Sequence, residues 1–403
     1  MEDAQVHVIG GGLGGLAAAA FVARSGYAVV VHERRGRLGG RATTEERQGY
    51  RFNQGPHALY LGGEAAAVLR DLGVPMPGST PPTNGTRMVL GGDLRLAPGG
   101  VGSLLRTTII GARDKLELAS LMARLPRLVP SDFADRTVDG WLDELTERER
   151  VRALLHAIVR LTTYTNAPDQ LSAEVAIRQV QLGLGDGVRY LDGGWERLVD
   201  GLAGVVIGNG GEIRRDHGMN DLPDAPAVIV AVGGPAQTAA VTGHRYQNGV
   251  AAEAAVLDLS LRHAPTHRFV VGVDEPIYLS DHGSTGSMCP PGRGSVSLAQ
   301  YLAPGDEPDR ERLQAFARHA RIASDDVVDE RYLHRMTTVS AIATATTGGL
   351  ASRPSVAVPD RAGVFVVGDW VGPTGHLADA VLASARAAAD AAIARVSALR
   401  GVR

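Results

Sequence analysis

The stretch VHVIGGGLGGLAAAAFVARSGYAVVVHE, residues 6–33, decides the fold of this chain. Residues 6–9 are apolar, residues 13–25 are rich in alanine, and residues 28–32 form a second apolar run. This change of pattern from strand to helix to strand predicts a βαβ unit of a parallel sheet. The six glycines within residues 6–31, and the changing pattern, favour this unit over a membrane span.

The glycines between the first strand and the helix have the G-x-G-x-x-G spacing of dinucleotide-binding turns. Gly10 permits a tight turn, Gly12 lets a pyrophosphate approach the backbone, and Gly15 lets helix and strand pack closely. The helix N-terminus offers free N–H groups and a partial positive charge to the phosphates. Glu33 ends the second strand, where an acid can accept hydrogen bonds from a ribose diol. We therefore predict a dinucleotide site that includes Leu13 and Gly14; the alternative is a glycine-rich turn without a ligand.

Composition and charge limit the functional classes. With 403 residues the chain is long enough for two domains, and its net charge of −3 gives no electrostatic reason to expect a nucleic-acid partner. Cys289 is the only cysteine, so we expect neither an intrachain disulfide nor a cysteine-based metal cluster, and we predict no metal site. Residues 1–5 are acidic and lack the basic region of a signal peptide, and a cytoplasmic protein is expected.

The residues that follow the acid, RRGRLGGR at positions 34–41, indicate which dinucleotide binds. This stretch resembles the flavin-containing amine oxidase and phytoene desaturase superfamily, which has an acid, a short spacer and then Gly-Gly-Arg at this place. The resemblance implies FAD as cofactor, with Gly39 and Gly40 close to its pyrophosphate and Arg41 paired with it. Glycines permit close backbone approach, and a guanidinium offers forked donors to phosphate oxygens. Arg34 is assigned to the same site, and the alternative is a basic surface turn.

Residues 49–57, GYRFNQGPH, also resemble the superfamily, although Asn53 stands where an Asp is common. The resemblance implies that residues 55–58 run beside the isoalloxazine ring. We therefore assign Gly55, Pro56 and His57 to the cofactor site.

A second signature lies near the end of the chain. Residues 364–367 read as a strand, followed by Gly368 and Asp369, a Gly/Pro-rich loop and an alanine-rich helix over 378–399. This order resembles the second superfamily signature, in which the acid approaches the ribityl and phosphate region. The helix N-terminus there faces the pyrimidine edge of the flavin, where it would stabilise negative charge on the reduced ring. The residues expected near the ring are Leu377, Ala378 and Ala380; the alternative is a terminal helix that only caps a domain.

Two residues of this segment depart from the superfamily pattern. His376 falls where many amine oxidases have a cage tyrosine, and Asp379 falls where they usually have Gly. The only lysine, Lys115, lies in a helical segment far from the flavin signatures. These departures disfavour an aromatic cage and a lysine-assisted oxidase.

The middle of the chain supplies the rest of the predicted α/β architecture. Residues 192–202 resemble the Gly-Gly-x-x-x-Leu helix opening of the superfamily, which implies a backbone contact to adenine near Met219. Leucines near helical spacing mark one insert, and strand-like runs mark another. We predict a discontinuous Rossmann-like FAD-binding domain, with an α+β substrate domain inserted into it. The FAD-binding domain comprises 1–62, 190–245 and 352–403, and the substrate domain comprises 63–189 and 246–351.

The predicted function is that of an FAD-dependent oxidoreductase acting on a small molecule. The candidate bases are His57 and His376, whereas Tyr60, Tyr164, Tyr278, His282 and Trp370 are pocket candidates more often found in packing roles. The first hypothesis is a dehydrogenase or desaturase that takes a hydride from a C–C unit of an apolar or prenyl-like compound. The alternatives are an oxidase of C–N bonds, which a carboxylate-binding Arg178 or Arg335 would favour, and a redox-neutral flavoprotein isomerase. The leucine-rich helices can be read in two ways. They form the core of the substrate domain, or they make peripheral contact with a membrane. Substrate identity, electron acceptor and oligomeric state are not readable from the sequence.

Overall fold

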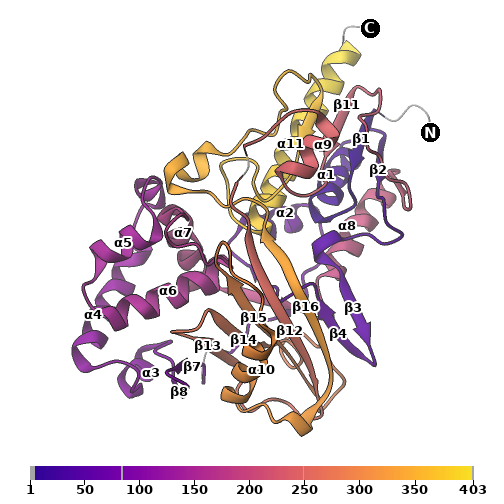
Figure 1. Cartoon of the computed structure of the whole chain (residues 1–403). Coiled ribbons are helices and arrows are strands. Elements are labelled where there is room, and N and C mark those ends of the chain that lie inside the picture. The colour runs from indigo at the N-terminus through magenta and orange to yellow at the C-terminus, as the bar shows by residue number, and fades with distance from the viewer. Residues whose placement is uncertain (1–4, 83–84, 248, 402–403) are drawn as a thin grey trace.

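The computed structural model describes residues 5–82, 85–247 and 249–401. The acidic start of the chain, residues 1–4, and the last two residues of the expected FAD-binding domain lie outside the described residues. Two bodies are visible in Figure 1. The upper right holds a parallel sheet with its helices and both chain ends, and the lower left holds a larger, mostly antiparallel sheet with a group of helices.

The first body is a five-stranded parallel sheet in the order β10–β2–β1–β11–β17, and it confirms the predicted Rossmann-like fold. From β1 the chain moves outward to β2 in one direction and to β11 in the other, so the topological switch point lies between β1 and β11. The strands are β1 (Val6–Ile9), β2 (Val29–His32), β10 (Glu212–Arg214), β11 (Ala227–Val230) and β17 (Val364–Val366).

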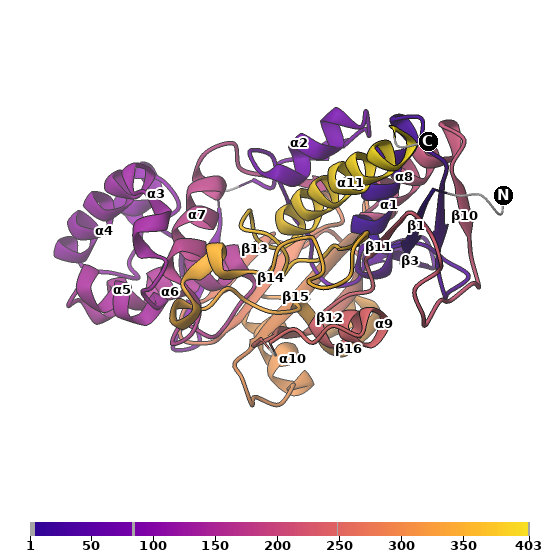
Figure 2. The same ribbon diagram turned by 90° about the horizontal axis from the view of Figure 1, so that it is seen from above.

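Three helices cover one face of this sheet, as Figure 2 shows from above. They are α1 (Leu13–Arg24), α8 (Glu196–Gly208) and α11 (Ala378–Gly401). Small residues let α1 pack closely against its neighbours: a Cβ on Gly14 would lie 2.7 Å from Val367 and 2.8 Å from Val381. A further helix, α2 (Glu64–Asp71), packs against α11 although it falls in the range expected for the substrate domain.

The second body is built on a seven-stranded sheet in the order β16–β12–β15–β14–β13–β7–β8. Its strand β7 comes from the first insert and pairs in parallel with β13 of the second, so the two inserts share one sheet. The strands are β7 (Arg87–Leu90), β8 (Asp93–Leu96), β12 (Ala252–Leu261), β13 (Phe269–Gly272), β14 (Ile277–Asp281), β15 (Gly294–Leu302) and β16 (Val327–Val339).

Helices of the first insert pack beside this sheet and form the left part of Figure 1. They are α3 (Val101–Arg106), α4 (Ala112–Arg124), α5 (Val138–Leu145), α6 (Glu149–Thr163) and α7 (Ala173–Leu184), while α10 (Arg310–His319) packs on the sheet itself. Smaller sheets connect the two bodies. They comprise the hairpin β3 (Thr44–Arg47) and β4 (Tyr50–Asn53), and the set β5 (Leu59–Tyr60), β9 (Val188–Leu191) and β6 (Gly78–Ser79).

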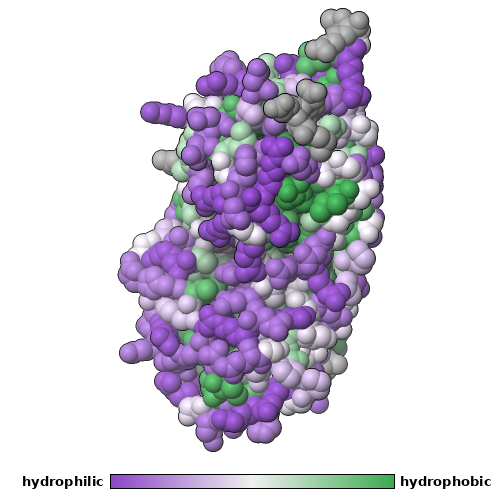
Figure 3. Space-filling view, turned by 90° about the vertical axis from the view of Figure 1, so that its right-hand side faces the viewer, coloured by the Kyte–Doolittle hydropathy of each residue, from purple (hydrophilic) through white to green (hydrophobic). Residues whose placement is uncertain are grey.

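The side of the molecule that is on the right in Figure 1 is mainly hydrophilic, with small separate hydrophobic patches (Figure 3). Over the described part of the chain, no helix combines the length and apolar character needed to cross a bilayer.

Candidate cofactor and substrate site

The turn between β1 and α1 contains two kinds of glycine. A Cβ on Gly10, whose φ is +109°, would lie 2.3 Å from the carbonyl oxygen of Ala231. A Cβ on Gly15 would lie 2.0 Å from the carbonyl oxygen of Gly10. Gly12 is different, because its nearest neighbour would be the Gly39 oxygen at 4.0 Å. The first two glycines are therefore needed for packing, whereas Gly12 leaves open backbone at a helix N-terminus that no side chain caps.

The acid at the end of β2 is held above this turn. The Glu33 carboxylate accepts hydrogen bonds from the backbone N–H of Gly11 at 2.8 Å and of Arg35 at 2.9 Å. The loop after β10 lies against the same residues, since His217 N–H donates to the Glu33 carbonyl and Gly218 abuts Arg34. Met219 follows in this loop and packs in the core cluster on the other face of the sheet. Its expected adenine contact, like the cofactor roles of Glu33 and Arg34, stays a prediction.

The Gly-Gly-Arg segment lies directly on the glycine turn. Gly39 N–H donates to the Gly11 carbonyl at 2.8 Å, and Gly39 forms a bridge with Gly12. A Cβ on Gly40 would have Gly12 Cα as its nearest atom, at 3.8 Å. Arg41 then reaches across to the C-terminal signature, where its Nη1 donates to Oδ2 of Asp369 at 2.8 Å. The structure therefore brings the N-terminal and C-terminal signatures together at the carboxyl end of the parallel sheet.

Asp369 is almost completely buried, but only one of its two carboxylate oxygens accepts hydrogen bonds. Its Oδ2 accepts from Arg41, from Ser340 N–H at 3.0 Å and from the Ser340 hydroxyl at 3.3 Å. Its Oδ1 has no hydrogen-bond partner. Gly368, the residue before it, is tied to α11 through the Ser384 hydroxyl. A buried carboxylate oxygen without a donor is costly, and it would be satisfied by a ligand hydroxyl.

The start of α11 is a strained turn. Leu377 has a φ of +53°, a left-handed conformation that non-glycine residues seldom adopt and that often marks functional sites. Ala378 begins the helix and Ala380 is fully buried.

The departure at Asp379 has a structural reason. Its Oδ1 accepts the N–H of Ala65 at 2.8 Å and thereby caps α2, while Oδ2 is buried without a partner. Burial raises the pKa of the Asp379 carboxyl to about 6. The carboxylate therefore ties the N-terminal turn of α11 to that of α2.

The two candidate bases sit in different surroundings. His57 Nδ1 donates to the Gly55 carbonyl at 2.7 Å, and its ring packs on Trp195 at a centroid distance of 4.7 Å. His376 is buried, and its Nε2 donates to the Thr163 carbonyl at 2.9 Å, while its Nδ1 has no partner. Burial lowers the pKa of both imidazoles to about 4. Both rings are therefore neutral at pH 7, and because a carbonyl only accepts, each keeps one acceptor nitrogen.

Five buried or half-buried tyrosines, which we call the aromatic cluster, lie beside these histidines. They are Tyr60, Tyr164, Tyr190, Tyr278 and Tyr301. The hydroxyls of Tyr164 and Tyr278 are 2.9 Å apart, and the rings of Tyr278 and Tyr301 stack at 5.5 Å. Burial raises the pKa of the Tyr164 phenol to about 12, so this group is a neutral donor and acceptor rather than a base.

A buried Ser–His pair extends the aromatic cluster. Ser280 Oγ is 2.9 Å from Nε2 of His282, and the His282 ring stacks on Tyr190 at 4.3 Å. Burial lowers the pKa of His282 to about 3, so the ring is neutral. Of the pocket candidates, Trp370 lies elsewhere, because its indole donates to the Gly233 carbonyl on the far side of the parallel sheet.

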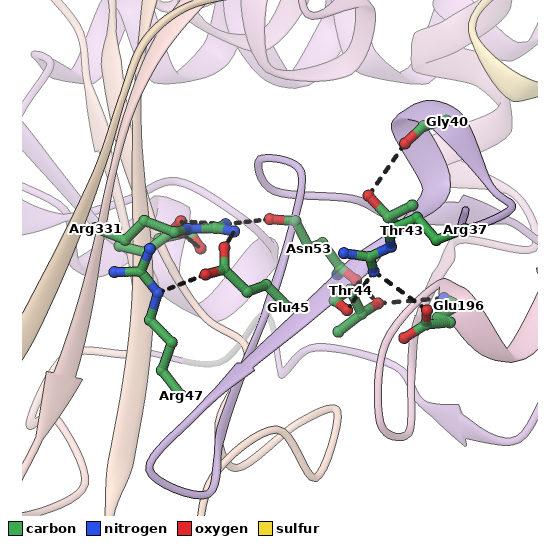
Figure 4. A network of polar contacts seen from close by, with 11 residues as sticks. Arg37, Gly40, Thr43, Thr44, Glu45, Arg47, Asn53, Glu196 and Arg331 are labelled. Atoms are coloured by element: carbon green, nitrogen blue, oxygen red, sulfur yellow. Dashed lines mark hydrogen bonds and ion pairs between the residues drawn. The ribbon is translucent and has the colours of Figure 1, made fainter. Parts of the chain in front are cut away.

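A buried polar network connects this region to the large sheet (Figure 4). Arg331 is 3% exposed and donates to Asp258 at 2.6 Å and to Glu45 at 3.1 Å, and it also contacts the Asn53 carbonyl. The Asn53 side-chain oxygen accepts from Trp195 N–H at 3.0 Å and from the Thr44 hydroxyl at 2.9 Å. An amide can therefore serve at position 53, where the superfamily often has Asp. The network fixes the hairpin that leads into Gly55 and His57.

Buried polar atoms without partners test whether the residues fit a flavin nucleotide. Five such atoms, on four residues of the C-terminal segment, are Nε and Nη2 of Arg353, Oδ1 of Asp369, Nδ1 of His376 and Oδ2 of Asp379. The atoms of Arg353, Asp369 and His376 are the donors and acceptors that ribityl hydroxyls and pyrimidine carbonyls would need in this segment, whereas the Asp379 carboxyl faces Gly63 and Ala65 at the start of α2. The residues present therefore fit FAD. No group of side chains suited to holding a metal ion is found in the described residues.

Sequence reasoning missed several residues of this site. Tyr190, Ser280 and Arg353 lie in segments without a motif for them, and Trp195 lies in the motif of residues 192–202 at a position to which the motif gives no role. Only the fold brings these four residues to the site. The carboxylate-binding role considered for Arg335 is not supported, because it pairs with Glu253 at 2.6 Å and with Glu307 at 3.3 Å.

The chain is similar to known proteins in sequence and in structure. Residues 8–72 match the NAD(P)-binding Rossmann-like domain family. The chain is 39% identical to 4,4'-diapolycopen-4-al dehydrogenase of Metabacillus indicus over 70 residues, 17% of this chain and 14% of the relative. It is 44% identical to phytoene desaturase of Cercospora nicotianae over 66 residues, 16% and 11% of the two chains. A flavin-containing monoamine oxidase of Mycobacterium tuberculosis is 27% identical over 319 residues, 74% of this chain and 65% of the relative. The chain thus spans less than two thirds of each of these relatives.

Solved structures with the same fold cover nearly the whole chain. An oxidoreductase from Methanosarcina mazei has a TM-score of 0.71 at 18% identity, over 94% of this chain and 98% of that one. Cyclohexylamine oxidase from Brevibacterium oxydans has a TM-score of 0.67 at 17% identity, over 99% and 100%. At these identities the likeness concerns the fold alone. The expected resemblance to flavin-containing amine oxidases and phytoene desaturases is confirmed by the relatives, and the α/β fold by the structures.

Proposed function

We propose that this chain is an FAD-dependent oxidoreductase that removes a hydride from a carbon of a small molecule. The observation that carries the proposal is the meeting of two distant signatures. The Gly39–Gly40 segment lies on Gly12, and Arg41 pairs with Asp369, so one extended ligand could contact both. Bound FAD would supply the hydride acceptor, its N5 atom.

The chain's own residues would bind and orient this ligand. Gly12 and the uncapped start of α1 suit a pyrophosphate, and the free Oδ1 of Asp369 suits a ribityl hydroxyl. His57, whose neutral ring lies between the Gly55 carbonyl and the backbone of Arg41, is the candidate that receives a substrate proton. Its pKa of about 4 makes it a weak base, so it would act mainly by positioning that proton.

We favour dehydrogenation of a C–C unit in an apolar or prenyl-like substrate. Oxidases that activate a water with lysine need that residue at the ring, but Lys115 is the only lysine and lies in α4, where its Nζ donates to the Leu105 carbonyl. The buried tyrosines of the aromatic cluster offer a largely aromatic surface with a few hydroxyl contacts.

Oxidation of a C–N bond is the second candidate, and two observations favour it. The match to the monoamine oxidase extends over 319 residues, whereas the match to phytoene desaturase covers only 66. In addition, Arg353 has unpaired donors that could hold a carboxylate.

Peripheral membrane contact belongs to the same proposal, because an apolar substrate would be drawn from a bilayer. Four exposed apolar side chains lie on or next to α3 and α4: Val101 (80% exposed), Leu105 (72%), Leu116 (75%) and Val129 (55%). Five basic and two acidic residues occur between positions 99 and 130, while the whole chain carries −3. Both acids, Asp114 and Glu117, pair with Arg148. The surface therefore suits an anionic bilayer.

The test begins with flavin content and proceeds to substrates. The purified chain is expected to carry FAD, or to take it up, and to show the absorption of oxidised flavin. Anaerobic mixing with prenyl-type hydrocarbons should bleach this absorption if the first candidate is right, and bleaching by amines alone favours the second. Double-bond migration with pre-reduced flavin and no net oxidation would point to the isomerase alternative. A chain that neither holds nor takes up FAD overturns the proposal.

A further inference from the structure

Arg353 lies against the loop that carries the C-terminal signature. It directly follows the short 3-10 helix Gly349–Ser352, and its Nη1 donates to the Gly375 carbonyl at 2.9 Å. The next residue, Pro354, accepts the N–H of Gly372 at 2.9 Å. The guanidinium is therefore held beside the turn that leads into α11.

One edge of this guanidinium has no partner. Nε and Nη2 of Arg353 are both buried and make no hydrogen bond. The N–H groups of these two atoms point in parallel from the same edge of the planar group. That edge binds carboxylates and similar planar acceptor pairs through two parallel hydrogen bonds. The occupied atom, Nη1, lies on the other side, so the bond to Gly375 leaves the edge free.

The neighbouring acidic side chains do not accept hydrogen bonds from this edge. Asp369 and Glu174 are near enough to raise the Arg353 pKa, but burial dominates and lowers it to about 10. Asp369 uses its Oδ2 for Arg41 and Ser340, and Oε2 of Glu174 accepts the N–H of Leu350 at 2.9 Å. Neither acid forms an ion pair with Arg353 among the described residues. Two buried N–H groups of a charged guanidinium without an acceptor are costly, which indicates that a ligand supplies one at this edge.

We propose that the Nε–Nη2 edge of Arg353 binds a planar pair of adjacent acceptors that carries negative charge. Two sources have this chemistry: a carboxylate on the substrate, and the N1–C2=O2 edge of the reduced flavin. The flavin source rests on the proposed function, since the start of α11 is expected at the pyrimidine edge. The carboxylate source deepens the second candidate function by naming its substrate class, an amine or amino-acid derivative with a free carboxylate.

The experiment compares three variants with the wild-type chain. Arg353→Met removes charge and donors, and Arg353→Lys keeps the charge but loses the paired donors. Arg335→Met is the matched control, since this partly exposed arginine pairs with Glu253 and Glu307 on the surface. For each protein we would measure the FAD dissociation constant, the flavin midpoint potential, and the change in flavin absorption on titration with benzoate and with acetate. The thermal shift given by the same carboxylates is measured on FAD-free protein.

The two sources give different results. If the edge holds the flavin, Arg353→Met lowers the midpoint potential and leaves the response to carboxylates unchanged. If it holds a carboxylate, the potential stays the same and benzoate binding weakens about 10- to 100-fold, as for a lost charge-assisted pair. In either case the affected quantity, the midpoint potential or the benzoate affinity, should be intermediate in Arg353→Lys between its values in wild type and in Arg353→Met. If all four proteins have the same FAD dissociation constant, midpoint potential and carboxylate affinity, the proposal is overturned. A wild-type chain without FAD refutes the proposed function, and the thermal shift of FAD-free protein still tests the carboxylate site.

Discussion

Arg41 and Asp369 form an ion pair, with Nη1 and Oδ2 2.8 Å apart, although 328 positions separate them in the sequence. Asp369 is buried, whereas the Arg41 side chain is 43% exposed. The arginine belongs to the segment that lies on the glycine turn, and the acid belongs to the loop before α11. This pair therefore joins the two halves of the candidate cofactor site.

We predict that Asp369→Asn weakens FAD binding about 10- to 100-fold, because an amide loses the ion pair with Arg41 and one charged acceptor. Fluorescence titration of FAD-free protein measures this constant. Arg136→Met is the control, since Arg136 pairs with the exposed Glu144 in the first insert and should leave binding unchanged. Wild-type affinity in Asp369→Asn would show that this carboxylate does not meet the cofactor.

Gly12 and Gly15 should respond differently to the addition of one methyl group. A Cβ on Gly15 would lie 2.0 Å from the Gly10 oxygen, so Gly15→Ala should destabilise the fold by about 1–3 kcal/mol or more through overpacking. Gly12 has a φ of −78° and open space, so Gly12→Ala should fold normally. The added methyl would instead obstruct the pyrophosphate and weaken FAD binding. Urea denaturation and FAD titration of both variants separate the two effects, and equal losses of stability would contradict this assignment.

The buried pair of Arg331 and Asp258 should be a major contribution to stability. Arg331→Met would leave the Asp258 carboxylate buried without its partner, at a cost of about 3–5 kcal/mol. The mutated position also contacts the Asn53 carbonyl, so the hairpin before His57 should loosen and hydrogen exchange there should speed up. Glu330→Gln on the same strand breaks the partly exposed ion pair with Arg310 and keeps an acceptor for the Gln314 amide, so it should cost below about 1 kcal/mol. Similar losses of stability in Arg331→Met and Glu330→Gln would show that the buried pair contributes no more than the exposed one.

The βαβ unit and the last helix could be predicted from sequence because their information is local. A glycine turn, a run of alanines and short apolar strands each lie within a few consecutive residues, and the structure places β1, α1, β2 and α11 within a few residues of the expected bounds. The resemblance of residues 34–41 correctly led to relatives of the amine oxidase and phytoene desaturase type.

Other features depend on contacts between distant segments. Nothing near position 87 indicates that β7 pairs in parallel with β13 across more than 180 residues. The capping of α2 by Asp379 and the free edge of Arg353 likewise arise only when the loop before α11 meets the first insert and the 3-10 helix before Arg353. Sequence alone therefore predicts the dinucleotide-binding fold and the type of its relatives, whereas the contacts of Asp379 and Arg353 could be found only from the folded structure.

Asp379 makes the stability of the chain depend on pH. Its pKa is about 6 in the folded state and 3.8 in the reference state, so the folded state binds more protons between these values. Stability should therefore fall as pH rises from about 4 to above 6, by up to roughly 3 kcal/mol. Asp379→Asn keeps an acceptor for the Ala65 N–H and removes the buried charge.

This variant should be more stable than wild type by roughly 3 kcal/mol at pH 8 but by only about 1 kcal/mol at pH 4.5, as thermal unfolding at both values would reveal. Asp379→Gly serves as the comparison. It removes the acceptor that caps α2, so it should be less stable than wild type at low pH, where Asp379→Asn is not. A constant difference between Asp379→Asn and wild type at all pH values would rule out this source of pH dependence.

The exposed apolar residues of α3 and α4 should bring the chain to anionic bilayers. Leu105 and Leu116 would insert their side chains at the interface while the nearby basic residues face anionic headgroups. Vesicles of phosphatidylglycerol and phosphatidylcholine should therefore co-sediment the chain, and pure phosphatidylcholine vesicles should do so poorly.

The double variant Leu105→Asp/Leu116→Asp should lose most of this binding with unchanged stability, because both side chains are exposed. Ile207→Asp, which replaces a 60% exposed residue of α8, is the matched control and should still bind. Because headgroup attraction is screened by salt, binding should weaken at high ionic strength; retention of the double variant on the vesicles would remove α3 and α4 as the contact surface.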